Sequence, residues 1–319
     1  MRVALVLGAG GATGHAFHAG VLSTLAERTG WDARTADLIV GTSAGSGVGA
    51  ILRVGLSPQD LAARATGEPV STDAAKLVSK LGAPATAFAL DEQPTGSGAG
   101  PRRIAGPGVL SNAMRRPWTV RAGAVAAAML PPGRRSTQPI SRGIKAVHGP
   151  GWPDQPLWLC AVRSDDARRV VFGRDESPQA DLGDAVAASC AIPGYFEPVE
   201  IDGVTYIDGG AHSPTNADVL NGESFDAIVV SSPMSVARNA VRPAADMAMR
   251  LMFHRFLSVE LAALRRRGTK VLTFEPTVED LSVMGINAMD WTRRPRVVRQ
   301  VRESAAKRID AKGWSRWTG

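Results

Sequence analysis

Residues 37–54 read DLIVGTSAGSGVGAILRV, and this stretch decides the kind of fold that we expect. The run at 37–40 is short and apolar, which is typical of a strand buried in a sheet. Glycines at 41–45 interrupt the run, and small and apolar residues at 48–54 then favour a helix. A strand that leads through a tight glycine turn into a helix is the building unit of α/β proteins.

The same alternation continues on both sides of this stretch. Residues 3–7 predict a strand, 8–14 a glycine-rich turn and 16–27 a helix. Further strands are expected at 157–162, 169–172, 227–230 and 271–274, and a hairpin around Asp202-Gly203 is expected at 200–207. The sequence therefore predicts a three-layer α/β/α fold with a mostly parallel central sheet. We expect a main domain over 1–275 with an inserted helical cap at about 56–150, and a basic helical extension over 276–319.

The composition fits a globular protein, with 44% hydrophobic residues and a formal net charge of +7. The excess charge lies in residues 291–319, where nine Lys and Arg face two acidic residues. No apolar run reaches the length of about 20 residues that crosses a bilayer. Cys160 and Cys190 show neither disulfide nor metal-ligand spacing and suit buried thiols. We therefore expect a cytoplasmic protein without a metal.

The turn at 41–45 has the pattern Gly-x-Ser-x-Gly, centred on Ser43. Between a strand and a helix, such a turn projects the serine hydroxyl above the sheet, and Gly41 and Gly45 permit the close backbone packing. The start of the helix also brings N–H groups and a positive dipole end near a developing oxyanion. The pattern indicates a nucleophilic serine. The alternative is a serine that only begins a helix in a glycine turn.

The glycine-rich turn at 8–14 is a candidate oxyanion hole. Gly10 and Gly11 have no side chains, so their N–H groups can turn toward a shared point. A nucleotide phosphate loop is the competing interpretation. The dinucleotide fingerprint would need glycine at Thr13, and a Walker loop would need a lysine that is missing. We therefore expect no cofactor.

A serine nucleophile also needs a base. Asp208 ends a predicted strand, so its carboxylate can be held rigidly at the edge of the sheet. The histidines that follow Ser43 are His148, His212 and His254. In the usual order of an α/β-hydrolase triad, serine is followed by an acid and then by histidine. The residues alone leave both Asp208 and a histidine open as the base.

Four separate blocks resemble the patatin-like phospholipases. They are the turn at 8–14 with Gly20-Val21-Leu22, the turn at 41–45, the stretch ASCAIPGYFEPV at 188–199, and Asp208-Gly209-Gly210. Together they span residues 3 to about 220 in the order that the family shows. Their order and spacing are far more specific than any one motif.

The resemblance implies a patatin-like fold and a lipid acyl hydrolase that cleaves ester bonds through a Ser–Asp dyad. It implies that Ser43 is the nucleophile, that Asp208 is the proton acceptor, and that amides around Gly10 and Gly11 form the oxyanion hole. The family is not known to need a metal. Two alternatives remain: an esterase with a Ser-Asp-His triad that uses His212 or His254, and a catalytically degenerate lipid-binding module.

Two positions depart from the family pattern. The family usually has glycine where Ala9 stands, and arginine or lysine where Thr13 stands. The missing cation would weaken electrostatic support for the oxyanion turn or for an anionic head group. Thr13 therefore puts the substrate preference in question more than the chemistry.

The basic tail predicts a helix at 295–312 with a narrow apolar stripe of Val297, Val301, Ala305 and Ile309. One interpretation is a helix that lies peripherally on an anionic membrane, flanked by tryptophans. The other is a helix docked on the body with a solvated basic face. Nucleic-acid binding is not expected, because no known module or aromatic interleaving accompanies the charge. The expected partner is a lipid ester substrate.

Overall fold

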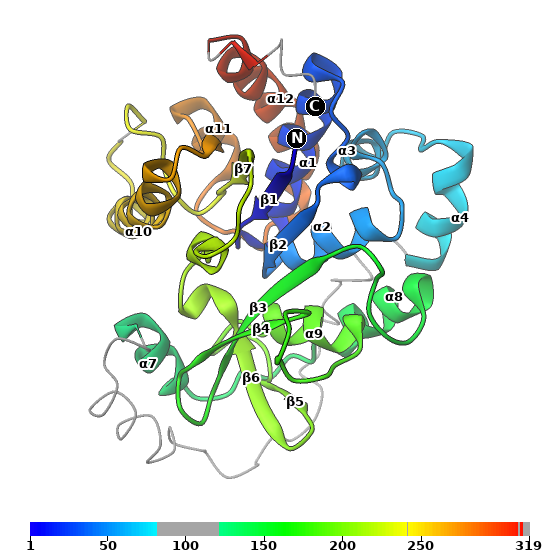
Figure 1. Ribbon diagram of the computed structural model, residues 1–319, viewed down its shortest axis with the longest axis vertical. Helices are drawn as coiled ribbons and strands as arrows, with labels where there is room; N and C mark the ends of the chain where they lie inside the picture. The colour runs from blue at the N-terminus through cyan, green and yellow to red at the C-terminus, as the bar shows by residue number, and fades with distance from the viewer. Residues whose placement is uncertain (82–120, 241, 312, 315–319) are drawn as a thin grey trace.

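The strand that precedes Ser43 lies near the middle of the central sheet (Figure 1). The computed structural model describes residues 1–81, 121–240, 242–311, 313 and 314. These residues form one eight-stranded sheet of order β5-β6-β3-β2-β1-β7-β8, with β4 paired to β3. The strands are β1 (Val3–Leu7), β2 (Leu38–Thr42), β3 (Leu157–Arg163), β4 (Arg169–Phe172), β5 (Val199–Ile201), β6 (Val204–Asp208), β7 (Ala227–Ser231) and β8 (Lys270–Phe274).

The sheet is mostly parallel, as predicted. Strands β3, β2, β1, β7 and β8 pair in parallel, whereas β4 and β6 run antiparallel to β3. Strands β5 and β6 form the expected hairpin around Asp202-Gly203. Every residue of β1, β2 and β7 is buried, which explains why their sequences are continuous apolar runs.

Helices cover both faces of the sheet. They are α1 (Gly11–Thr29), α2 (Ala44–Arg53), α3 (Pro58–Thr66), α4 (Thr72–Leu81), α7 (Ala122–Ala128), α8 (Gln138–His148), α9 (Leu182–Ser189), α10 (Met247–Arg266), α11 (Val278–Met284) and α12 (Arg294–Ala311). Alternate residues of β1 divide the core: Leu5 packs on the side of α1 and α12, and Val6 packs on the side of α10. Figure 1 shows α10 on the other side of β7 from α1 and α12. The three-layer α/β/α prediction is confirmed.

The glycine-rich segment at 8–14 is less of a turn than predicted, because α1 already begins at Gly11. Glycine costs about 1 kcal/mol in a helix interior relative to alanine. Close packing outweighs that cost here: a Cβ at Gly20 would lie 2.9 Å from the Val301 side chain of α12. Because α1 and α12 pack so closely together, only small residues fit where they cross.

Helices of the expected cap region lie beside the sheet. Helix α3 packs against α1 and α12, and α8 packs against α9. The last residue of helix α8 is His148, one of the three histidines that follow Ser43 in the sequence. The turn-rich stretch at 94–101 lies outside the described residues.

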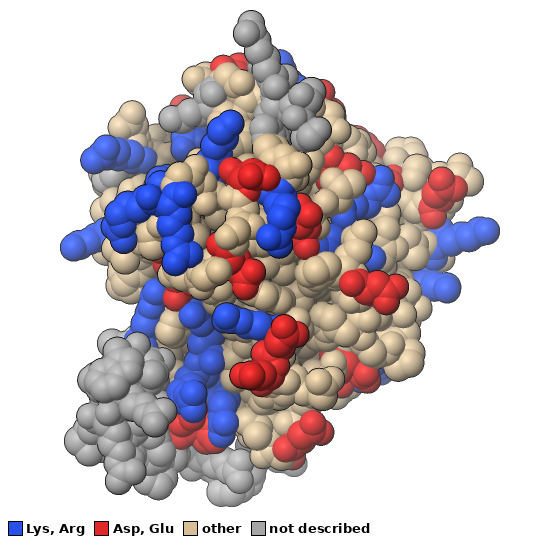
Figure 2. Space-filling view, viewed as in Figure 1, with Lys and Arg blue, Asp and Glu red and all other residues tan. Residues whose placement is uncertain are grey.

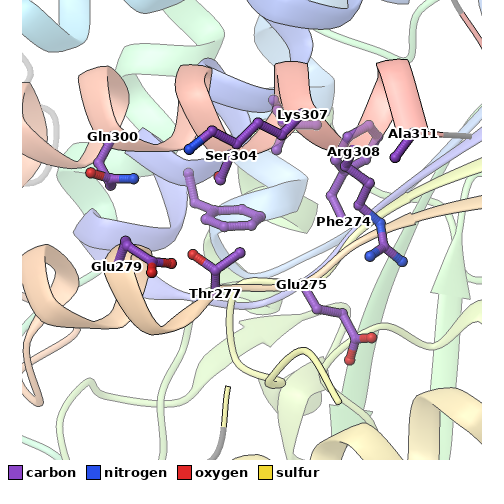
Figure 3. A pocket seen from close by; sticks show the side chains of 12 residues that line it. Phe274, Glu275, Thr277, Glu279, Gln300, Ser304, Lys307, Arg308 and Ala311 are labelled. Carbon is purple, nitrogen blue, oxygen red and sulfur yellow. The ribbon is translucent and has the colours of Figure 1, made fainter. Parts of the chain in front are cut away.

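The C-terminal extension packs on the body through its apolar stripe. Val297, Val301, Ala305 and Ile309 are all at most 2% exposed, and α12 makes its main contact with α1. On its polar side, Ser304 and Lys307 line a cavity of about 280 Å³ opposite Thr277 (Figure 3). No helix in the described ranges is both long enough and apolar enough to span a membrane.

Candidate active site

Ser43 lies in the corner between β2 and α2 with a backbone φ of 54° and ψ of −119°. A positive φ is unfavourable for a residue with a side chain, so neighbouring groups must hold it. The Ser43 N–H donates to Ser189 Oγ at 2.9 Å, and Ser189 Oγ donates to the Cys160 carbonyl at 2.7 Å. This relay from α9 and β3 fixes the strained corner that presents the serine hydroxyl.

The glycines of the Ser43 turn are explained by close packing. A Cβ at Gly41 would lie 2.6 Å from the Ser46 Cα, and one at Gly45 would overlap the Leu7 carbonyl of β1. Side chains at these two positions would therefore push α2 away from the sheet. The spacing of the motif reflects this close approach of strand and helix.

Asp208 ends β6 and is 4% exposed, as is Ser43. Its N–H donates to the Ala191 carbonyl at 2.9 Å, and its Oδ1 accepts the Gly210 N–H at 2.7 Å. Burial raises the pKa of Asp208 to about 6, although hydrogen bonding from the Ser43 hydroxyl and the Gly210 N–H opposes the rise. The structure thus brings together the two side chains that the sequence singled out.

Gly10 and Gly11 occupy the corner where β1 turns into α1. The N–H of Ala9 donates to the Pro214 carbonyl, and that of Thr13 donates to the Ala288 carbonyl at 3.0 Å. Between them, the N–H groups of Gly10 and Gly11 have no backbone acceptor within the described part of the chain. Gly11 has a φ of 58°, and a Cβ there would lie 2.7 Å from the Ala288 oxygen. Only glycine fits this close approach at the start of the helix.

The Ser43 hydroxyl opens into a small apolar pocket. Its lining includes Gly11, Ala12, His15, Ala44, Ile140, Cys190, Ile192, Phe196, Met289 and Trp291. The pocket volume of about 20 Å³ holds little more than one water molecule. Met289 and Trp291 belong to the basic C-terminal extension predicted over 276–319. No local pattern indicated that they would close over the serine.

Buried positive charge lies behind the pocket even though Thr13 carries none. Burial lowers the pKa of His15, and the charges of Arg294 and Arg64 lower it further. Arg294 is 7% exposed, and its guanidinium lies 5.3 Å from the Trp291 ring centroid. The positive potential near the glycine turn therefore comes from α12 and α3 rather than from position 13.

The candidate histidines lie in other surroundings. His212 is buried with a pKa lowered to about 3, chiefly by burial and then by Arg169 and Arg121. His254 Nδ1 lies 2.7 Å from Glu275 Oε1 on the α10 side of the sheet. Across the described residues, neither histidine makes a hydrogen bond to Ser43, and no group of three potential metal ligands converges.

Comparison with known proteins agrees with the fold and the motifs. A family model described as patatin-like phospholipase matches residues 5–221. No curated protein matches the chain in a sequence search. Among solved structures, VipD from Legionella pneumophila is similar, with 13% identity and a TM-score of 0.46 over 97% of this chain and 67% of that one. The ExoU–SpcU complex from Pseudomonas aeruginosa matches with 16% identity and a TM-score of 0.40 over 98% of this chain and 52% of its own. This chain thus spans about half the length of that match.

Proposed function

Because the chain belongs to the patatin-like phospholipase family, a family of lipid acyl hydrolases, we propose that it hydrolyses lipid acyl esters with Ser43 as nucleophile and Asp208 as base. The observation that carries the proposal is the buried Asp208 carboxylate beside the Ser43 hydroxyl, with its pKa raised to about 6. A base with a pKa near the working pH is both ionised and able to accept a proton.

The proposed reaction has two halves. Ser43 Oγ attacks the ester carbonyl carbon while its proton passes to Asp208, and the oxyanion forms near the N–H groups of Gly10 and Gly11. Asp208 then gives the proton to the leaving alcohol, and an acyl-serine remains. Water attacks this ester, again with Asp208 as the base, and the products are a free fatty acid and regenerated Ser43.

The pocket lining supports an acyl substrate. Ile140, Ile192, Phe196 and Met289 surround the serine with apolar side chains, which suit a hydrocarbon chain better than a sugar or a peptide. The present volume of about 20 Å³ is too small for such a chain. Substrate entry therefore requires Met289 and Trp291 to move outward.

A Ser-Asp-His triad is less well supported than the dyad. His254 is engaged by Glu275, and the lowered pKa of His212 makes that imidazole a weak base. A catalytically degenerate lipid-binding module is the non-enzymatic alternative. Peripheral contact of the basic C-terminal segment with an anionic membrane would have to use exposed arginines such as Arg296 and Arg299, because its apolar stripe is buried.

Covalent labelling with a fluorophosphonate tests the proposal most directly. The wild type should be labelled at Ser43, whereas Ser43→Ala should not be labelled; Ser258→Ala, which changes an exposed serine on α10, is the matched control. A panel of phospholipids, lysolipids and triacylglycerols would then identify the substrate. Absence of labelling in the folded wild type would favour the binding module.

A further inference from the structure

Helix α10 presents apolar side chains to solvent as well as to the core. Its inner side chains, Leu257, Leu261 and Leu264, are at most 2% exposed. A second apolar series lies on the adjacent side of the helix: Met249, Met252, Phe253, Phe256 and Val259. We call these five residues the outer face of α10. Their spacing of three and four residues places them along one side of the helix.

The outer face is exposed to an unusual degree for apolar side chains. Met249 is 40% exposed, Met252 45% and Val259 72%. Phe253 and Phe256 are partly buried, and their rings lie at a tilted angle of 49° with centroids 6.4 Å apart. Single exposed apolar residues are ordinary, but a continuous helical face of them marks a surface that contacts something apolar.

The charges around this face have one sign. Helix α10 contains four arginines, of which Arg255, Arg265 and Arg266 are exposed, and its one carboxylate, Glu260, is 3% exposed. Figure 2 shows Lys and Arg side chains gathered over the part of this surface that α10 occupies. The exposed surface of the helix is therefore apolar and cationic, with no exposed carboxylate of its own.

The beginning of α10 lies close to the candidate oxyanion turn. Arg250 donates to the Pro233 carbonyl at 2.9 Å. The Pro233 ring packs against the glycine turn, since a Cβ at Gly10 would lie 2.9 Å from it. One layer of residues thus separates the helix from the turn that adjoins Ser43.

Arg121, the residue before α7, contacts the same surface. The Arg121 guanidinium lies 5.0 Å from the Phe256 ring centroid. Beyond α7, Met129 is 60% exposed and Leu130 51%. Leu130 approaches Gly194 in the loop that supplies Ile192 and Phe196 to the serine pocket. Exposed apolar groups therefore lie near the loop that lines the serine pocket, and α10 lies one layer of residues from the glycine turn.

We propose that the outer face of α10 docks the protein on an anionic lipid surface. Such a surface offers an apolar interior for Met252 and Val259 beneath a layer of negative head groups for Arg255 and Arg266. The docking would bring the Ser43 pocket to lipid esters, and this second part rests on the function proposed above. The anchor is α10, because the apolar stripe of α12 is already covered by α1.

Vesicle sedimentation of the full chain tests the docking, with phosphatidylcholine vesicles that do or do not contain phosphatidylglycerol. The double variant Met252→Gln/Val259→Gln should lose vesicle affinity by about 10-fold or more, since two exposed side chains no longer enter the apolar layer. Val278→Gln, which changes a 39% exposed residue on α11, should leave binding unchanged. Wild-type affinity in the double variant would overturn the proposal.

A pair of arginine variants separates α10 from the C-terminal helix. Arg255→Gln should weaken binding to the anionic vesicles by about five-fold, whereas Arg299→Gln on α12 should not. An equal loss in both variants, or a larger loss in Arg299→Gln, would assign the contact to α12 and overturn the proposal. Equal binding to vesicles with and without phosphatidylglycerol would overturn the proposal that the lipid surface is anionic.

Two further readouts distinguish docking from catalysis and from self-association. Ser43→Ala should bind vesicles like the wild type, and the α10 double variant should cleave a water-soluble short-chain ester at the wild-type rate. If the hydrolase proposal is wrong, the wild type should bind vesicles but should not cleave esters. A wild-type dimer that the double variant converts to a monomer would identify a second copy as the occupant and overturn the proposal.

Discussion

Two cavities on different sides of the molecule contain a hydroxyl group and a carboxylate, and they differ in almost every other respect. The pocket at Ser43 has a volume of about 20 Å³ and apolar walls, and it adjoins a buried carboxylate. The cavity at His254 has a volume of about 490 Å³, and its walls include Ser258, Glu275 and three arginines (Arg238, Arg265 and Arg308). The larger cavity has the conventional acid–histidine pair, yet the smaller one has the strained serine.

Neither the volume of a cavity nor the number of charged side chains in its wall is a good guide to the reactive site in this fold. Glu275 lies 2.7 Å from His254 Nδ1 and shares the cavity with three arginines. Asp208 lacks a cation among its described contacts, and burial therefore raises its pKa. A poorly compensated carboxylate beside a serine on a strained backbone is the combination expected of a nucleophile and its base.

Removal of the nucleophile should give the largest difference between the two cavities. Ser43→Ala should lower kcat/KM for an acyl ester by at least about 10⁴-fold, because no acyl-enzyme can form. Ser258→Ala, in the larger cavity, should retain the wild-type value. Circular dichroism of both variants checks that the fold is intact, and residual activity in folded Ser43→Ala would move the nucleophile elsewhere.

Removal of the base should have the next largest effect. Asp208→Asn should lower kcat by about 10² to 10⁴-fold, the range that a positioned general base contributes. In the wild type, kcat/KM should rise with pH, reach half its maximum near pH 6 and then stay level, since the carboxylate form accepts the proton. A profile governed by a group with a different pKa would contradict this assignment.

The Asp208 carboxylate should make stability fall with rising pH, whereas it should make activity rise. Its folded pKa is raised from 3.8 to about 6, so the stability of the wild type falls as the pH rises through this interval. Asp208→Asn avoids this loss and should be more stable above pH 6 by up to about 3 kcal/mol. Urea unfolding at pH 4 and pH 8 checks the prediction, which requires the difference to fall below about 1 kcal/mol at the lower pH.

Enlargement of the small pocket should have a moderate effect. Met289→Ala removes a side chain that closes over Gly11, so long-chain esters should gain several-fold in kcat/KM relative to short-chain esters. Measurement of both substrates on one preparation cancels any loss of folded protein. Val278→Ala, an exposed change on neighbouring α11, serves as the control and should leave the ratio unaltered.

The histidine of the larger cavity should give the smallest effect. His254→Ala should leave kcat and KM for acyl esters within about two-fold of the wild type, since the proposed base, Asp208, adjoins the other cavity. The same is expected of His212→Ala in protein that stays folded. A loss of several orders of magnitude in either variant would establish the Ser-Asp-His triad in place of the dyad.

The strands and the two motif side chains were predictable because their signals are local. The apolar runs of β1 and β7 allow little but buried strands, and the glycines on either side of Ser43 fit only a tight strand-to-helix turn. Asp208 was harder to recognise from its own neighbours, since an Asp-Gly pair is also an ordinary turn. Its assignment came from the order of the family blocks.

Features that depend on distant contacts were missed. The first turn of α1 was expected to be irregular, because glycine propensity is local while its packing against Pro233 is not. Met289 and Trp291 were placed in a tail, since nothing near them in the sequence indicates the pocket that they close. The outer face of α10 was hidden for a related reason: hydrophobic periodicity cannot tell which of two apolar sides meets the core.

The close approach of Gly11 to the Ala288 carbonyl and the Met289 side chain has an evolutionary consequence. Segments near opposite ends of the chain meet there so closely that a larger residue on one side needs a compensating change on the other. Pocket shape and oxyanion geometry should therefore have drifted together among descendants of a common ancestor. New substrate preferences in such a lineage would arise through paired substitutions in these two segments more readily than through single ones.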